Sequence, residues 1–62
     1  MDGSELQKAR GDKSRREVCN ALGISLSALS MYESGDRVPR DELKTRMAQL
    51  YGTTVGRLFF GE

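Results

Sequence analysis

Gly23 separates two short segments of helical periodicity, and this arrangement constrains the fold more than any other feature of the chain. Before it, Ser14 and Glu17 have the spacing of a capping box, in which each residue satisfies a backbone N–H at the start of a helix. After it, Ser25 can cap a second helix. Helices commonly end at a residue that adopts a positive φ. The sequence therefore predicts two helices joined by a tight turn at Gly23.

The length and the net charge of the chain exclude few classes of function by themselves. The chain has 62 residues, and we expect residues 1–62 to form one small domain with a modest core. There are 10 Lys and Arg against 9 Asp and Glu, a formal net charge of +1. Such a balance argues neither for nor against a nucleic-acid partner, so the placement of the charges must decide.

The composition argues against metal, membrane and catalytic functions. Cys19 is a single cysteine and there is no histidine, so we expect no disulfide, no metal site and no cofactor. We see no membrane-spanning run and no signal-peptide pattern, and we expect a cytoplasmic protein with no membrane partner. We find no nucleophile–base pair and no Gly-rich phosphate loop. An enzyme is therefore not expected, nor is a small-molecule ligand.

The apolar spacing predicts an all-α chain of five short helices. The first covers residues 6–10, the second runs to Leu22, and the third ends near residues 34–35. The fourth has Asp41 and Glu42 in its first turn and ends at Gly52, and a short fifth follows Thr53 or Thr54. The residues expected to be largely buried are Val18, Cys19, Leu22, Ile24, Leu29, Tyr32, Leu43, Met47, Leu50, Val55, Leu58 and Phe59.

One segment resembles the helix-turn-helix of the lambda-repressor and Cro family of bacterial and phage regulators, which is also called the xenobiotic-response-element type. This segment is residues 14–39, SRREVCNALGISLSALSMYESGDRVP. A second segment resembles the fourth and fifth helices of that family, and it consists of residues 43–60, LKTRMAQLYGTTVGRLFF. The chain departs from the family pattern at Arg15, where a glutamine is usual, at Cys19, where alanine is usual, and in a shorter first link. The family positions that carry the resemblance hold Ser14, Arg15, Cys19, Gly23, Ile24, Ser25 and Tyr32-Glu33-Ser34-Gly35.

The resemblance implies a compact five-helix DNA-binding domain, with a helix-turn-helix core at about residues 14–35 and the third helix in the major groove. The residues implied to read base edges are Leu26, Ser27, Ala28, Ser30 and Met31. The residues implied to contact the DNA backbone are Lys13, Arg15, Arg16, Ser25, Arg37 and Arg40. The basic cluster at the start of the second helix also lies where the helix dipole favours phosphate, although a solvated surface is the alternative interpretation.

Two functions are considered at this stage, of which the first is favoured and the second is the alternative. The first is a transcriptional regulator that binds double-stranded DNA in a sequence-specific manner, as a repressor or an activator. The second is a protein-interaction module on the same fold, such as an antitoxin or anti-repressor. The expected reading positions favour neither, because none is Arg, Lys, Asn or Gln. The exposed apolar residues Leu26, Ala28 and Met31 suit either thymine methyl groups or a protein partner.

Two further interpretations concern single residues. Glu33 is interpreted as structural, paired with a helix terminus or a nearby arginine. Single helix-turn-helix modules commonly bind as dimers on two half-sites, which leaves a homodimer open for this chain. Phe59 and Phe60 are candidates either for the dimer contact or for completing the core.

Overall fold

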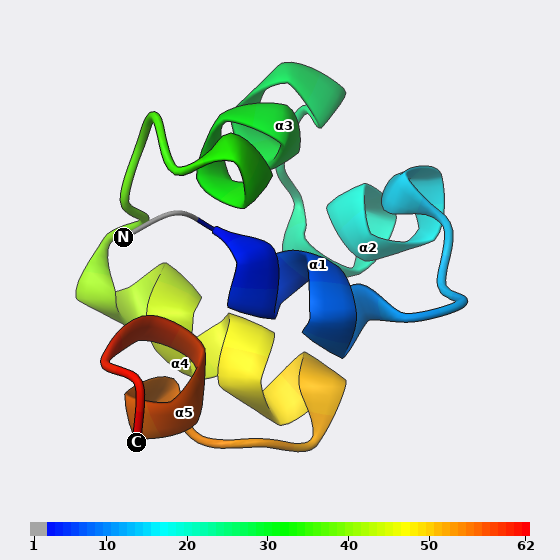
Figure 1. Ribbon diagram of the computed structural model, residues 1–62. Helices are drawn as coiled ribbons and strands as arrows, with labels where there is room; N and C mark the ends of the chain where they lie inside the picture. The colour runs from blue at the N-terminus through cyan, green and yellow to red at the C-terminus, as the bar shows by residue number, and fades with distance from the viewer. Residues whose placement is uncertain (1–2) are drawn as a thin grey trace.

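The computed structural model describes residues 3–62, which form five α-helices and no strand (Figure 1). The predicted all-α architecture is confirmed. The first helix begins at Ser4, earlier than expected. No helix within residues 3–62 combines the length and the hydropathy needed to span a bilayer. The helices are α1 (Ser4–Arg10), α2 (Arg15–Leu22), α3 (Leu26–Ser34), α4 (Asp41–Tyr51) and α5 (Val55–Phe59).

Hydroxyl side chains fix where three of these helices begin. The Ser14 hydroxyl accepts a hydrogen bond from the Glu17 backbone N–H at 3.0 Å, and the Glu17 carboxylate accepts one from the Ser14 N–H at 3.4 Å. This is the predicted capping box of α2. Ser25 and Thr54 each accept from the N–H three residues later, at 3.0 and 3.1 Å. Thr54 is therefore the cap of α5.

The turn between α2 and α3 has the predicted conformation. Gly23 has φ 69° and ψ 35°, in the left-handed region, where a side chain is strained. A Cβ built at Gly23 would meet no atom within 4 Å, so the backbone conformation alone explains the glycine. The Ile24 N–H donates to the Cys19 carbonyl at 3.1 Å, which closes the end of α2.

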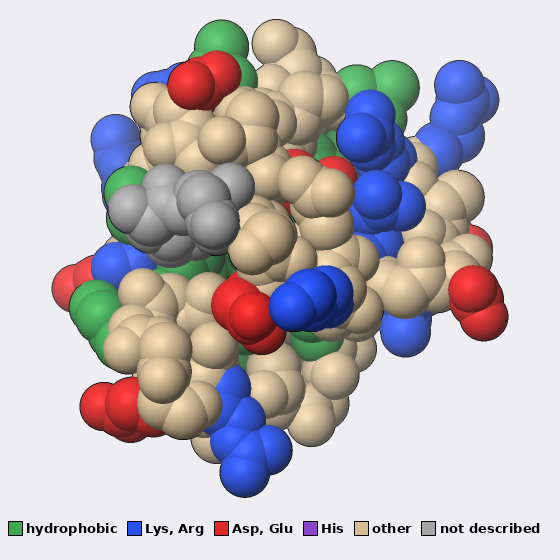
Figure 2. Space-filling model, in the orientation of Figure 1, with side chains coloured by type: hydrophobic (Ala, Val, Ile, Leu, Met, Phe, Trp, Pro, Cys, Tyr) green, Lys and Arg blue, Asp and Glu red, His purple; other side chains and the backbone are tan. Residues whose placement is uncertain are grey.

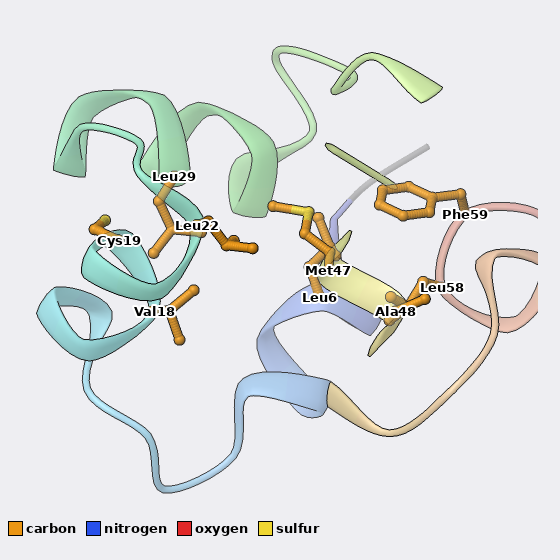
Figure 3. Close-up of a cluster of buried hydrophobic side chains, with 9 residues drawn as sticks. All are labelled: Leu6, Val18, Cys19, Leu22, Leu29, Met47, Ala48, Leu58 and Phe59. Carbon is orange, nitrogen blue, oxygen red and sulfur yellow. The ribbon is translucent and has the colours of Figure 1, made fainter. Parts of the chain in front are cut away.

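All five helices contribute side chains to one buried cluster (Figure 3). The residues that are buried as predicted are Val18, Cys19, Leu22, Leu29, Met47, Leu58 and Phe59. Leu6 and Ala48 complete the cluster and were not predicted. Five expected core residues are only half-buried and pack around it, because so short a chain has much surface for its volume. These are Ile24, Tyr32, Leu43, Leu50 and Val55.

The packing leaves one side of α3 exposed. α3 packs chiefly on α1 and α2, whereas α4 packs on α5 and α2. Figure 1 shows α3 at one end of the molecule, with α4 and α5 at the other. The side of α3 that points away from α1 and α2 therefore faces solvent.

Candidate nucleic-acid interface

The side chains of α3 divide between a buried side and an exposed side. Leu29 is fully buried and Glu33, one turn later, is 2% exposed. On the other side, Leu26 is 47% exposed and Met31 is 40% exposed. We call the exposed side the outward face of α3, and it consists of Leu26, Ser27, Ser30, Met31 and Ser34.

Ala28 is not part of the outward face, contrary to the expectation that it would be exposed. It is half-buried, and so is Tyr32, which lies one turn later on the same side of the helix. This flank adjoins the buried side that carries Leu29. The remaining four positions expected to read bases lie together on the outward face.

The carboxylate of Glu33 ties the end of α3 to α1. Arg10 donates from Nε to Glu33 Oε2 at 2.7 Å and from Nη2 to Oε1 at 3.2 Å. These hydrogen bonds raise the pKa of the Arg10 guanidinium above its ordinary range, although burial acts in the opposite direction. Gln7 Nε2 donates to the Glu33 carbonyl oxygen at 2.8 Å. The interpretation of Glu33 as structural is confirmed, and its partner is Arg10.

Gly3 allows the start of α1 to approach the end of α3 closely. A Cβ built at Gly3 would overlap the Glu33 carbonyl oxygen and would lie 2.6 Å from the Tyr32 carbonyl oxygen. Gly3 also has a positive φ of 75°. The inward side of α3 is therefore fixed by backbone contact as well as by the Arg10 ion pair, which leaves its outward face as the side available to a ligand.

The first basic group, Lys13, Arg15 and Arg16, lies at the start of α2. Arg15 Nε is 3.5 Å from Glu33 Oε1, and the Arg15 side chain is 53% exposed. Arg15 is therefore held beside the end of α3 while much of its guanidinium remains accessible. Arg10 Nη1 donates to the Lys13 carbonyl at 3.1 Å, which positions the loop before α2. Arg16 is exposed, and its side chain has no ion pair within residues 3–62.

The second basic group, Arg37 and Arg40, lies in the connector between α3 and α4. The Arg37 N–H donates to the Met31 carbonyl at 3.2 Å, which holds the connector against the end of α3. Both side chains are exposed and form no ion pair with any described residue. The nearby Asp36 carboxylate accepts a hydrogen bond from Ser34 at 3.0 Å.

The outward face of α3 thus lies between cationic groups. Figure 2 shows hydrophobic side chains together with an acidic one at the upper edge of the molecule, over α3, and Lys and Arg side chains to either side. Ser25, at the start of α3, is exposed, but its hydroxyl already caps the helix. Apart from Ala28, the expected base-reading positions share the outward face of α3, and the expected backbone-contacting positions lie at the start of α2, at the N-cap of α3 and in the connector after α3.

The two candidate dimer residues have different environments. Phe59 is 8% exposed and belongs to the core. Phe60 is 65% exposed, and the Lys44 ammonium lies 5.2 Å from the centre of its ring, within the range of a cation–π interaction. Only Phe60 is accessible to a second copy of the chain.

Comparison with known proteins agrees with this geometry. A family model described as a helix-turn-helix domain matches residues 3–58. No curated protein and no solved structure matches the chain. The matched range contains α2, the turn at Gly23, α3 and both basic groups. The chain belongs to the helix-turn-helix domain family.

Proposed function

We propose that this chain is a sequence-specific DNA-binding transcriptional regulator of the phage repressor and Cro type, which acts by occupying an operator. One observation carries the proposal: the outward face of α3 is exposed between two basic groups whose side chains are mostly without partners among residues 3–62. The major groove of B-DNA is wide enough to admit an α-helix. α3 is the helix that enters it.

Contacts to the phosphates orient α3 in the groove. Arg16, Arg37 and Arg40 are accessible cations, and Arg15 adds a cation at the first residue of α2. Backbone N–H groups at the start of a helix favour phosphate as well. Lys13 and the N-cap Ser25 complete the backbone-contacting set. Such contacts set position and register, whereas base edges supply the sequence information.

Glu33 and Asp41 do not oppose this arrangement, whereas the exposed Asp36 adds one negative charge at the end of α3. Glu33 is buried and paired with Arg10 and Arg15, so it presents little negative charge to a phosphate. Asp41 pairs with Lys44 at 3.7 Å at the start of α4. A net charge of +1 is therefore compatible with a basic surface around α3.

The dependence of duplex affinity on salt tests the proposal. If Arg15, Arg16, Arg37 and Arg40 each neutralise one phosphate, log K should fall with log salt with a slope of roughly −3.6 per protomer, and about twice that for a dimer. Fluorescence anisotropy with a random-sequence duplex measures this slope. Circular dichroism of the same sample establishes that the protein is folded.

A protein partner is the second candidate, because Leu26 and Met31 expose apolar surface on α3. Under this hypothesis the chain is an interaction module such as an antitoxin or anti-repressor. A protein partner leaves the placement of the two basic groups unexplained, and we favour DNA as the partner for that reason. Absence of duplex binding at low salt, in a folded sample at micromolar concentration, would replace the first candidate by the second.

A homodimer on two half-sites belongs to the same proposal, with Phe60 as the accessible contact. Sedimentation of the protein bound to a selected duplex counts the protomers. A single protomer on every selected site would remove the dimer from the proposal without affecting DNA binding.

A further inference from the structure

We propose that the outward face of α3 selects DNA sites through the C5-methyl groups of thymines, with Leu26 and Met31 as the residues that determine specificity. This inference rests on the proposed DNA-binding function and adds the chemistry by which the site is read. It predicts an operator with thymines at fixed positions opposite α3.

The outward face lacks the side chains that recognise bases by paired hydrogen bonds. Arg and Lys recognise guanine in this way, and Asn and Gln recognise adenine. None of these four residue types occurs in α3, whose sequence is LSALSMYES. Its one charged residue, Glu33, is buried and bound to Arg10. α3 therefore presents only hydroxyl and apolar groups to the groove.

The serines of the outward face discriminate weakly. The Ser27 and Ser30 hydroxyls make no hydrogen bond with other residues in the described range 3–62. A hydroxyl both donates and accepts, so it can pair with several bases. Ser34 already bonds to the Met31 carbonyl and to Asp36, each at 3.0 Å. Strong selection must come from the other members of the face.

Leu26 and Met31 supply that selection. The thymine methyl is the apolar group that standard bases present in the major groove. The two side chains are 47% and 40% exposed, so contact with a methyl group removes apolar surface from water on both sides. Cytosine, adenine and guanine offer no such group.

The spacing of the two residues sets the spacing of the thymines. They are separated by five residues along α3, which is about 7.5 Å at the helical rise of about 1.5 Å per residue. One base pair adds about 3.4 Å along the duplex. A helix that lies along the groove therefore places Leu26 and Met31 over different base pairs.

Selection from a randomised duplex library, followed by methyl removal, tests this inference. Each enriched thymine is replaced by deoxyuridine, which keeps the base pair and removes only the methyl group. We expect affinity to fall about fourfold at each contacted position, from about 0.8 kcal/mol per buried methyl. Deoxyuridine at thymines outside the enriched site is the control and should change nothing. At the same positions, 5-methylcytosine should bind more tightly than cytosine.

Two substitutions at one position assign the effect to α3. Met31→Leu keeps an apolar side chain and should keep the sensitivity to deoxyuridine. Met31→Gln is similar in length but polar, and it should lose that sensitivity at one position while Leu26 keeps it at the other. Both variants alter an exposed side chain and should unfold at the same denaturant concentration as the wild-type protein.

The possible failures are distinguishable. A wild-type protein that binds duplex and enriches a site, but tolerates deoxyuridine at every position, overturns thymine-methyl recognition and leaves DNA binding intact. A library that yields no enriched sequence does the same, since the face then selects nothing. Absence of any duplex binding overturns both this inference and the proposed function.

Discussion

Arg10 holds Glu33 through two hydrogen bonds, from Nε at 2.7 Å and from Nη2 at 3.2 Å, and this pair joins α1 to the last turn of α3. Glu33 is 2% exposed and the Arg10 side chain is 19% exposed, so the carboxylate is largely removed from water. The pair fixes the inward side of α3. The orientation of the outward face depends on it.

Removal of Arg10 should destabilise the fold strongly. Arg10→Met leaves the buried Glu33 carboxylate with only Arg15, at 3.5 Å, and should lower the free energy of unfolding by about 3 kcal/mol. The double variant Arg10→Met, Glu33→Met should recover much of this loss, because no buried charge is left. Urea denaturation measures the free energy of unfolding of the wild-type protein, the single variant and the double variant.

The exposed pair of Lys8 and Glu5 provides the control for charge removal. Their atoms are 3.6 Å apart and both side chains are largely in solvent. Lys8→Met should change stability by less than about 1 kcal/mol. If Arg10→Met cost no more than Lys8→Met, the pair between α1 and α3 would have no structural role.

Leu29 and Leu26 provide a matched test of the two sides of α3. Leu29 is fully buried, so Leu29→Ala should lower the free energy of unfolding by roughly 2–5 kcal/mol, a large share of the stability of so small a fold. Leu26 is exposed, and Leu26→Ala should cost less than about 0.5 kcal/mol. Denaturant titrations that show equal losses would contradict the assignment of the two sides.

The glycines at positions 23 and 3 separate backbone strain from steric overlap. Both have positive φ, but only Gly3 lies against other backbone atoms. Gly23→Ala should cost about 1–2 kcal/mol from strain alone, and the β-branched Gly23→Val more. Gly3→Ala should cost more than Gly23→Ala, because the start of α1 must also move away from α3. Equal costs in thermal denaturation would show that the close contact of Gly3 contributes nothing.

Local features of the chain could be predicted from sequence, whereas long-range features could not. The capping box at Ser14 and the positive φ of Gly23 depend on neighbouring residues, and both are confirmed. The pairing of Arg10 with Glu33 joins positions 23 residues apart, and several basic residues were equally plausible partners. The half-burial of Ala28 depends on how α3 packs, which helical periodicity alone does not specify.

Tyr51 should make stability depend on alkaline pH. Its hydroxyl is buried without a hydrogen-bond partner among the described residues, and burial raises the pKa of Tyr51 to about 12 from an ordinary 10.0. The folded state therefore favours the neutral phenol. As pH rises from about 10 to about 12, the unfolded chain releases this proton first, and wild-type stability should fall.

Tyr51→Phe removes both the buried hydroxyl and the proton that this hydroxyl releases at alkaline pH. Near neutral pH it should raise the free energy of unfolding by about 1 kcal/mol, because an unsatisfied hydroxyl is lost. The difference in free energy of unfolding between Tyr51→Phe and the wild-type protein should grow between about pH 10 and pH 12, since phenylalanine has no proton to release. Urea denaturation of both proteins across this range checks the difference. A difference in free energy of unfolding that stays constant over this pH range would contradict the raised pKa of Tyr51.

Arg16 and Arg57 test whether duplex binding depends on where the charge lies. Arg16 is an exposed cation in the first turn of α2, and Arg57 is an exposed cation in α5. Arg16→Ala should weaken binding to all duplexes alike and flatten the log–log salt slope by about 0.9, the contribution of one phosphate contact. Arg57→Ala makes the same change in net charge and should leave the slope unaltered. Equal flattening by both variants, measured by anisotropy over a salt series, would mean that net charge rather than the surface around α3 determines binding.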